Sequence, residues 1–184
     1  MLVFLFLLER LRRHLDNERA LARTDPVTGI FNRRGFMEHL QYNIDLMARD
    51  GRPIALAYID LDDFKQINDR RGHDAGDKVL QDVASSLVSS VRKTDIVGRL
   101  GGDEFALLIT GADRIKAENC INKIRESFSI ALGSDQCAIT CSIGCVTCVS
   151  PVSSMDSVIR AADLLMYKVK SGGKNGVSFE DFMQ

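Results

Sequence analysis

The sequence predicts a single domain in which helices and β-strands are mixed, preceded by a short helical extension. Its 184 residues suffice to bury one substantial core and little more. Stretches with the helical spacing of apolar residues alternate with short apolar runs typical of strands. Gly101 and Gly102 join two of these runs and predict a hairpin. We expect the domain over residues 23–184 and a helical stalk or linker over residues 1–22.

The elements follow from the spacing of apolar residues. Phe36, Leu40 and Ile44 recur every four residues, which places them on one face of a helix. The run at 53–60 is continuously apolar until it ends in acid, which is typical of a buried strand. In chain order we predict a helix around 36–47, a strand at 53–60, a helix around 79–91, hairpin strands near 96–97 and 105–109, a helix around 115–128, a strand near 137–149, a helix at about 156–170, and an apolar segment at 177–179.

Two acidic residues, Asp103 and Glu104, directly follow the paired glycines. Glycine permits a sharp turn at positive φ, and carboxylates at the tip of such a turn suit a divalent metal ion. A solvated turn would also carry acidic residues, so a partner carboxylate is needed. Asp60 supplies one, because it ends the strand at 53–60, where sheets of this kind usually carry their chemistry. We predict that Asp60 and Asp103 form a pair of metal ligands.

Asp62 lies two residues beyond Asp60, on the same side of an extended chain. A calcium loop also begins Asp-x-Asp. Here, however, Phe64 and Lys65 stand where such a loop needs an oxygen ligand and a glycine. Asp62 also has a structural alternative, as the N-cap of the short helix that follows. We therefore give it less weight as a ligand than Asp60.

Several short motifs follow one another over roughly residues 23–179. They are Asp25–Arg34, with Val27 where leucine is usual, then Asp60–Asp69, Gly72–Asp77, Gly101–Phe105, Thr140–Gly144, Ala162–Lys170 and Gly173–Asn175. Together they resemble the GGDEF-domain diguanylate cyclase family, and several motifs at compatible spacings are far more specific than the hairpin alone. The resemblance implies an α+β, palm-like fold with a central, mostly antiparallel sheet flanked by helices.

The resemblance also implies the reaction. Two GTP molecules, one on each subunit of a homodimer, would be joined into cyclic di-GMP with release of pyrophosphate. A ribose 3′-hydroxyl must then attack the α-phosphorus, which two Mg²⁺ (or Mn²⁺) ions per active site can assist. Asp60, the Leu61 carbonyl, Asp103 and Glu104 would hold the metal. Glu104 would act either as a ligand or as the acceptor of the hydroxyl proton, and the sequence leaves both roles open.

For guanine recognition, the resemblance assigns Asn68 and Asp77, whose oxygens can accept from N1–H and the 2-amino group. Adenine lacks that donor pattern and would leave the acceptors unpaired. Each residue also has a structural alternative: Asn68 could cap a turn, and Asp77 could open a helix at residue 78.

For the triphosphate, the resemblance assigns Lys170 and Lys174, together with backbone amides near Phe64 and Lys65 at a helix N-terminus. Lys174 replaces the usual arginine, which keeps the charge but loses the two-pronged geometry. The rings of Phe64 and Tyr167 are expected to pack within the fold rather than stack on a base.

Arg92 and Asp95 resemble the family's inhibitory site for cyclic di-GMP, with five residues between Asp95 and Gly101. Arginine can bind phosphate and the O6/N7 edge of guanine, while aspartate accepts from N1–H. The structural alternative is an i, i+3 salt bridge at a helix end, worth about 0.2–0.5 kcal/mol.

Net charge and cysteine content limit the remaining classes of function. The net charge of −1 gives no support to a nucleic-acid partner. The five cysteines include a single CxxC, Cys145 and Cys148, whose odd offset on a strand places them on opposite faces. We therefore expect small buried residues in a reducing cytoplasm rather than a disulfide framework or a zinc site.

The N-terminal extension has two interpretations. Residues 1–8 are apolar but too few to cross a bilayer, so they could be the end of a longer membrane helix flanked by arginines. Alternatively, Phe4, Leu8, Leu11 and Leu15 form a heptad-like stripe that pairs with a second chain. Either stalk could connect the domain to an upstream sensor and tether it to the inner face of a membrane.

Two other function classes stay open. One is a catalytically inactive module that binds cyclic di-GMP or GTP as a sensor, and the other is a structural dimerisation module. The complete set of acidic and basic site residues argues against degeneration of the active site.

Overall fold

The computed structural model describes residue 10, residues 22–131 and residues 139–183. Almost all of the predicted stalk at 1–22 lies outside these residues. The strands are β1 (Phe31–Asn32), β2 (Ile54–Leu61), β3 (Ile96–Arg99), β4 (Glu104–Thr110), β5 (Cys141–Cys148) and β6 (Gly176–Asp181). The helices are α2 (Arg33–Asp50), α3 (Phe64–Arg71), α4 (His73–Ser90), α5 (Arg114–Ala131) and α6 (Met155–Ser171).

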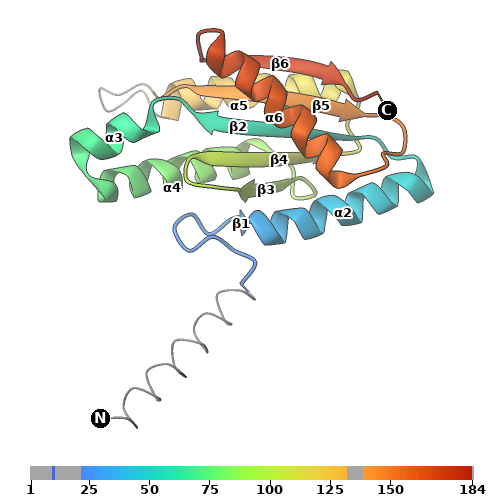
Figure 1. Cartoon of the computed structure of the whole chain (residues 1–184), viewed down its shortest axis with the longest axis horizontal. Coiled ribbons are helices and arrows are strands. Elements are labelled where there is room, and N and C mark those ends of the chain that lie inside the picture. Colours follow the sequence, from blue (N-terminus) through green and yellow to red (C-terminus); the bar gives the residue numbers. More distant parts are fainter. Residues whose placement is uncertain (1–9, 11–21, 132–138, 184) are drawn as a thin grey trace.

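The six strands form one sheet in the order β1-β3-β4-β2-β5-β6 (Figure 1). Strand β2 is antiparallel to both of its neighbours, β4 and β5, and β3 is antiparallel to β4. The two outermost pairs, β1 with β3 and β5 with β6, are parallel. This mostly antiparallel sheet, flanked by helices, confirms the predicted palm-like α+β fold.

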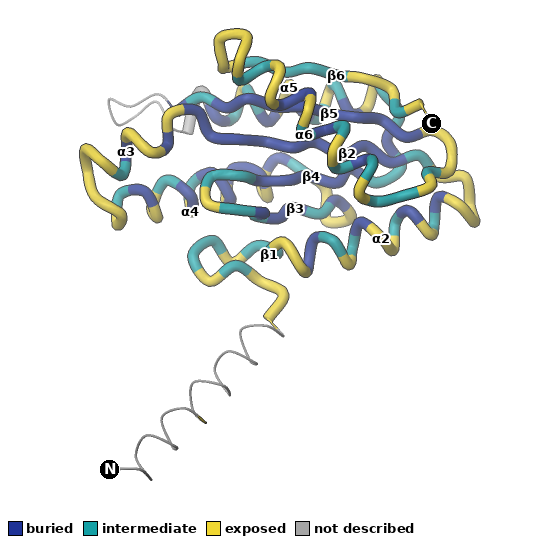
Figure 2. The backbone as a smooth tube through the Cα atoms, in the orientation of Figure 1, coloured by how far each residue is buried: buried dark blue, intermediate teal, exposed yellow. Residues whose placement is uncertain are grey.

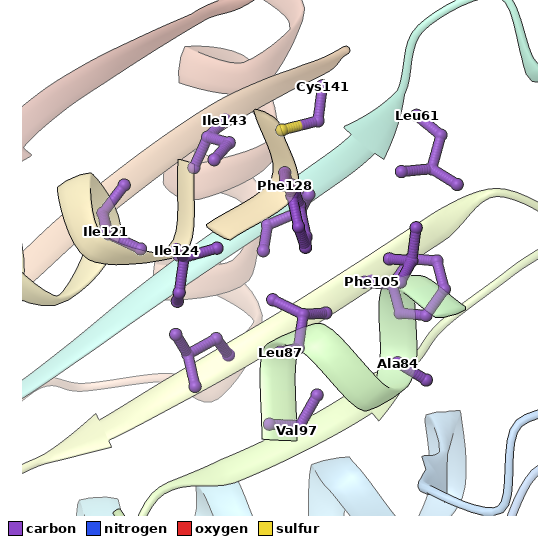
Figure 3. Close-up of a cluster of buried hydrophobic side chains, with 14 of the residues drawn as sticks. Leu61, Ala84, Leu87, Val97, Phe105, Ile121, Ile124, Phe128, Cys141 and Ile143 are labelled. Carbon is purple, nitrogen blue, oxygen red and sulfur yellow. The ribbon is translucent and has the colours of Figure 1, made fainter. Parts of the chain in front are cut away.

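Strand β2 lies at the centre of the core, and all eight of its residues are buried (Figure 2). Alternate side chains enter two separate apolar clusters, because successive residues of a strand point to opposite faces. Ala55 and Ile59 join the cluster formed with α4 and α5, part of which Figure 3 shows. Leu56 and Tyr58 join the cluster formed with α2 and α6. A continuous apolar run is therefore correct for a strand that is covered on both faces.

The described cysteines are core residues or lie beside the core. Cys145 and Cys148 enter different clusters, as their odd spacing predicted. Burial raises the pKa of each of these thiols to about 12, so both stay protonated. Strand β5 begins at Cys141, and the part of the predicted strand before residue 139 lies outside the described residues.

No helix in the described part of the chain has both the length and the apolar character that a membrane crossing requires. The predicted membrane-helix remnant falls on residues outside that part.

Candidate active site at the ends of β2 and β4

The pairing of β2 with β4 brings the predicted acidic residues together. Asp60, near the end of β2, lies directly opposite Glu104, the first residue of β4. One residue further along, the Leu61 amide donates to the Asp103 carbonyl at 3.1 Å. Asp60, Asp103 and Glu104 therefore converge at one end of the sheet, although the two aspartates lie 43 positions apart in the chain (103 − 60).

The Asp60 carboxylate is buried and forms an ion pair with a lysine. It is only 4% exposed, and Lys170 Nζ donates to its two oxygens at 2.7 and 2.8 Å. Burial raises the pKa of Asp60, Lys170 opposes that effect, and the charges of Asp103 and Glu104 add to it. Lysine 170 extends from the last turn of α6, which covers this face of the sheet. The lysine thus neutralises an acidic group that burial alone would disfavour.

The Glu104 carboxylate has two close neighbours, Tyr58 and Gly101. The Tyr58 hydroxyl donates to Glu104 Oε2 at 3.2 Å. Burial and the nearby charge of Glu104 raise the pKa of the Tyr58 phenol, so the hydroxyl stays protonated and donates. On the other side, a Cβ added at Gly101 would lie 2.6 Å from the same Oε2.

This contact corrects the predicted reason for the glycine pair. Neither Gly101 nor Gly102 is among the residues with positive φ, so the turn does not depend on left-handed backbone. A side chain at Gly101 would meet the Glu104 carboxylate, which would have to move to make room for it. Nothing in the structure explains Gly102, which has open space at the position of a Cβ.

Arg99 and Asp25 hold the hairpin turn, and sequence reasoning missed this role. Arg99 Nε donates to the Gly101 carbonyl at 3.1 Å, and Nη2 donates to the Gly102 carbonyl at 2.8 Å. Arg99 Nη1 donates to Asp25 Oδ1 at 3.0 Å. Burial raises the pKa of Asp25, but hydrogen bonds from Thr28 and Arg99 outweigh it and hold the pKa below its ordinary value. The two residues are 74 positions apart, and no local pattern pairs them.

The donor set fits a hard divalent cation. Asp60, Asp103 and Glu104 supply carboxylate oxygens at adjacent strand ends, and Leu61, whose side chain is buried, can contribute only its carbonyl. In the described residues, no three side chains of histidine, cysteine, aspartate or glutamate are already grouped as a metal site. In this arrangement, the Lys170 ammonium is hydrogen-bonded to the Asp60 carboxylate.

Asp62 has a different environment, and its predicted alternative as an N-cap is wrong. The residue before α3 is Asp63, and its side chain makes no capping hydrogen bond. Asp62 is buried and accepts from Thr140 Oγ1 and Ser142 Oγ, both at 2.7 Å, and from the Asn175 amide at 2.9 Å. It therefore links the end of β2 to β5 and to the turn before β6.

The two predicted phosphate-binding lysines contact acidic residues at the end of β2 and in the loop that follows it. Lys174 Nζ donates to Asp63 Oδ1 at 2.7 Å, and this contact lowers the pKa of Asp63. Lys174 and Asn175 both have left-handed backbone, with φ of 64° and 47°. Because Asp63 does not cap α3, the amides of Phe64 and Lys65 at the start of that helix are not bound by its carboxylate.

Asn68 of α3 lies close to the turn of α4 that carries Asp77. A Cβ at Gly76 would lie 1.9 Å from Asn68 Oδ1, so this amide lies against the first turn of α4, one residue from Asp77. Helix α4 begins at His73, so the alternative that Asp77 opens a helix at residue 78 is wrong. The backbone carbonyl of Asn68 accepts from the Gly72 amide, whereas the side chain of Asn68 faces Gly76.

Of the two rings expected to pack, one does. Phe64 is buried in the core cluster with α4 and α5. Tyr167 is 64% exposed on α6, so the expectation that it packs within the fold is wrong.

Comparison with known proteins settles the family. A family described as "Diguanylate cyclase, GGDEF domain" matches residues 22–176. The chain belongs to the GGDEF family. Two relatives are the diguanylate cyclase DgcP of Pseudomonas aeruginosa, 34% identical over 165 residues, and the response regulator PleD of Caulobacter vibrioides, 34% identical over 172 residues. The alignments cover 88% and 91% of this chain, but only 24% of DgcP and 38% of PleD.

A solved structure agrees with the fold of this GGDEF domain. The coiled coil and GGDEF domain of DgcB from Caulobacter crescentus, in complex with c-di-GMP, superimposes with a TM-score of 0.79. The two sequences are 32% identical, and the match covers 94% of this chain and 93% of the other.

A second polar region of the GGDEF domain surrounds Arg92 and Asp95. Asp95 is buried, and its Oδ2 accepts from the Arg92 amide at 3.0 Å while Oδ1 accepts from the Thr110 amide at 3.1 Å. Among the described residues, the link between Arg92 and Asp95 is therefore to the backbone and not the side-chain salt bridge of the alternative. The Arg92 side chain is exposed at the rim of a cavity of about 320 Å³.

The same cavity reveals residues that sequence reasoning missed. Lys116, Asn119 and Lys123 of α5 line it opposite Arg92. Their spacing of three and four places them on one helix face, and this spacing was the available signal. Three cations around one cavity suit an anionic ligand.

Proposed function

We propose that this GGDEF domain is a diguanylate cyclase that condenses two GTP molecules into cyclic di-GMP and two pyrophosphates. The observation that carries the proposal is the convergence of Asp60, Asp103 and Glu104 at paired strand ends, with Lys170 and Lys174 beside them. Carboxylates that can bind a divalent ion and lysines that can bind a triphosphate thus lie at the same end of the sheet. The relative DgcP carries the same activity in its name.

In this proposal, Asn68 and Asp77 select guanine. Their side-chain oxygens accept from N1–H and the 2-amino group, and adenine would leave them unpaired at a cost of about 1–3 kcal/mol per group. The contact of Asn68 with Gly76 supports this role, because it holds the amide beside the turn that carries Asp77.

The triphosphate lies, in this proposal, between the start of α3 and the end of α6. The amides of Phe64 and Lys65 donate to phosphate oxygens, and Lys170 and Lys174 balance the negative charge. Mg²⁺ (or Mn²⁺), two per active site, supplies activation of the ribose 3′-hydroxyl and neutralisation of the pyrophosphate when bound. Asp60, the Leu61 carbonyl, Asp103 and Glu104 would hold it.

Cyclisation needs two GTP molecules facing each other, so the proposed active form is a homodimer with one GTP on each subunit. Rate per molecule should then rise with protein concentration. The decisive experiment incubates purified protein with GTP and Mg²⁺ over a range of protein concentrations and separates the products by chromatography. Asp103→Asn is the control. Cyclic di-GMP from wild type and not from the variant supports the proposal. Bound nucleotide without turnover identifies a sensor module instead.

The proposal includes product inhibition at the cavity beside Arg92. Arg92→Ala should weaken inhibition by cyclic di-GMP at least about tenfold, since it removes a charge-assisted contact to phosphate or guanine. The matched control is Lys93→Ala, which removes a neighbouring exposed cation that does not line the cavity. Equal inhibition of both variants and wild type would place the inhibitory control elsewhere.

A further inference from the structure

Tyr58 occupies a strand position that does not require a polar group. It lies on β2 between Leu56 and Asp60 on the same face, and it is 5% exposed within the cluster formed with α2 and α6. The neighbouring strand residues on that face, Ile54 and Leu56, are purely apolar. Its hydroxyl nevertheless has a specific partner, because it donates to Glu104 Oε2 at 3.2 Å.

The register of the sheet explains why these two residues meet. Glu104 is the direct cross-strand partner of Asp60, and Tyr58 stands two residues before Asp60. Tyr58 and Glu104 are therefore diagonal neighbours on one face, a separation that a long aromatic side chain can span. The ring is enclosed by apolar side chains of the core, so its hydroxyl is directed from a rigid base.

The backbone of Gly101 also lies close to the Glu104 carboxylate. A Cβ at Gly101 would lie 2.6 Å from the same Oε2, so the missing side chain leaves room for the carboxylate beside Tyr58. The Leu100 amide donates to the Glu104 carbonyl at 2.8 Å and fixes the backbone of Glu104. The carboxylate thus has a fixed backbone, a phenol donor and space beside Gly101, and together these favour one orientation beside Asp60.

We propose that Tyr58 is a positioning residue: its hydroxyl holds the Glu104 carboxylate in the orientation that the reaction requires. The inference rests on the proposed function and deepens it. A free glutamate side chain populates many rotamers, and ordering it costs free energy. A donor that orders it in advance removes that cost from the catalytic step. Tyr58 acts through Glu104 and contacts no substrate itself.

The test is Tyr58→Phe, which removes one oxygen and keeps the ring. We expect kcat to fall about tenfold while KM for GTP stays within about twofold, since a hydrogen bond to a charged group is lost. Binding of Mn²⁺ in the presence of a non-reactive GTP analogue, followed by electron paramagnetic resonance, should weaken by about threefold or more. Tyr42→Phe is the matched control, because it removes the same atom from an exposed position on α2.

A double-mutant cycle separates positioning from a merely structural role. In a Glu104→Gln background, Tyr58→Phe should change Mn²⁺ binding by less than about 1.5-fold, because the carboxylate that it orients is gone. A full additional loss in that background would overturn the proposal. So would a Tyr58→Phe variant whose kcat and Mn²⁺ binding match wild type, or one that loses only thermal stability. If wild type makes no cyclic di-GMP, the proposed function fails, whereas the Mn²⁺ measurements still decide the role of Tyr58.

Discussion

Asp60 and Asp62 stand two residues apart and are both 4% exposed, but their surroundings differ in kind. Asp60 is neutralised by one lysine from α6. Asp62 accepts from two hydroxyls and one backbone amide, and no cation is among these donors. The Lys170 side chain is 37% exposed, so its ammonium can leave for solvent or a ligand. The donors to Asp62 lie in or beside strand β5 and just before β6, so they stay in place.

Under the proposed function, the difference separates Asp60, which takes part in the chemistry, from Asp62, which stabilises the fold. Burial alone does not distinguish them, and neither does position in the Asp-x-Asp motif. What distinguishes them is whether the compensating group can be exchanged. A buried charge with fixed donors stabilises one arrangement of the chain, whereas a buried charge with a removable cation can accept another cation.

The strongest test of this comparison is Asp60→Asn. Turnover should fall on the order of 10²–10³-fold or more, since a charge aimed at the reacting groups is lost. The free energy of unfolding should change by less than about 1 kcal/mol, because the amide is easier to bury and Lys170 reaches solvent. Product formation and urea unfolding measure the two effects. Substantial residual activity would remove Asp60 from the proposed set of ligands.

The same substitution at the neighbouring aspartate should do the reverse. Asp62→Asn replaces an acceptor of three hydrogen bonds with an amide that presents two donors, so the free energy of unfolding should fall by about 2 kcal/mol. Activity per folded molecule should fall far less than in Asp60→Asn. Asp63→Asn is the matched control, since Asp63 is exposed and its surface ion pair with Lys174 contributes little to stability. Comparable stability of all three variants would contradict the comparison.

A third carboxylate, Asp25, is paired with Arg99, whose side chain is largely buried and is not free to leave for solvent. Asp25→Asn should lower the free energy of unfolding by about 1 kcal/mol at pH 7, because the charged bond from Arg99 is weakened. The pKa of Asp25 lies below its ordinary value of 3.8. Its contribution is therefore present above about pH 3.8 and is lost as the pH falls through the lower, folded-state pKa. Thermal unfolding at pH 7 and at pH 3 should show the difference between variant and wild type shrinking at acid pH.

The smallest expected effect concerns the other lysine. Lys174→Arg should lower KM for GTP about two- to threefold, because a guanidinium can bind phosphate through two parallel hydrogen bonds. The residue has positive φ with either side chain, so no new backbone strain is introduced. Lys168→Arg, at an exposed position near the end of α6, serves as the control and should leave KM unchanged. An increase in KM would show that the shorter reach of lysine is preferred.

Apolar periodicity predicted the order of elements well, because both faces of the sheet are covered and the central strands are buried along most of their length. The convergence of Asp60 with Asp103 followed from a simpler rule, that chemistry collects at strand ends. The contacts that orient the site were not predictable in this way. Tyr58 with Glu104 and Arg99 with Asp25 join residues 46 and 74 positions apart, and only the tertiary structure brings them together.

Local rules also misplaced individual roles. Glycine's tolerance of positive φ suggested why the turn contains Gly101, but the structure shows a steric reason instead. A preference for aspartate at helix N-caps suggested Asp62, but the chain turns one residue later and buries that carboxylate against β5. Both errors come from judging a residue by its sequence neighbours when its contacts are tertiary.

In the proposed site, Lys170 competes with a divalent ion for the Asp60 carboxylate. A divalent ion added alone must displace a tethered ammonium from both oxygens of that carboxylate. A triphosphate offers the ammonium another anion, so binding of the nucleotide and binding of the ion each favour the other. By thermodynamic linkage this help is equal in both directions. For the proposed metal site, we therefore expect titrations with magnesium in the absence of GTP to give a weaker affinity than titrations in its presence.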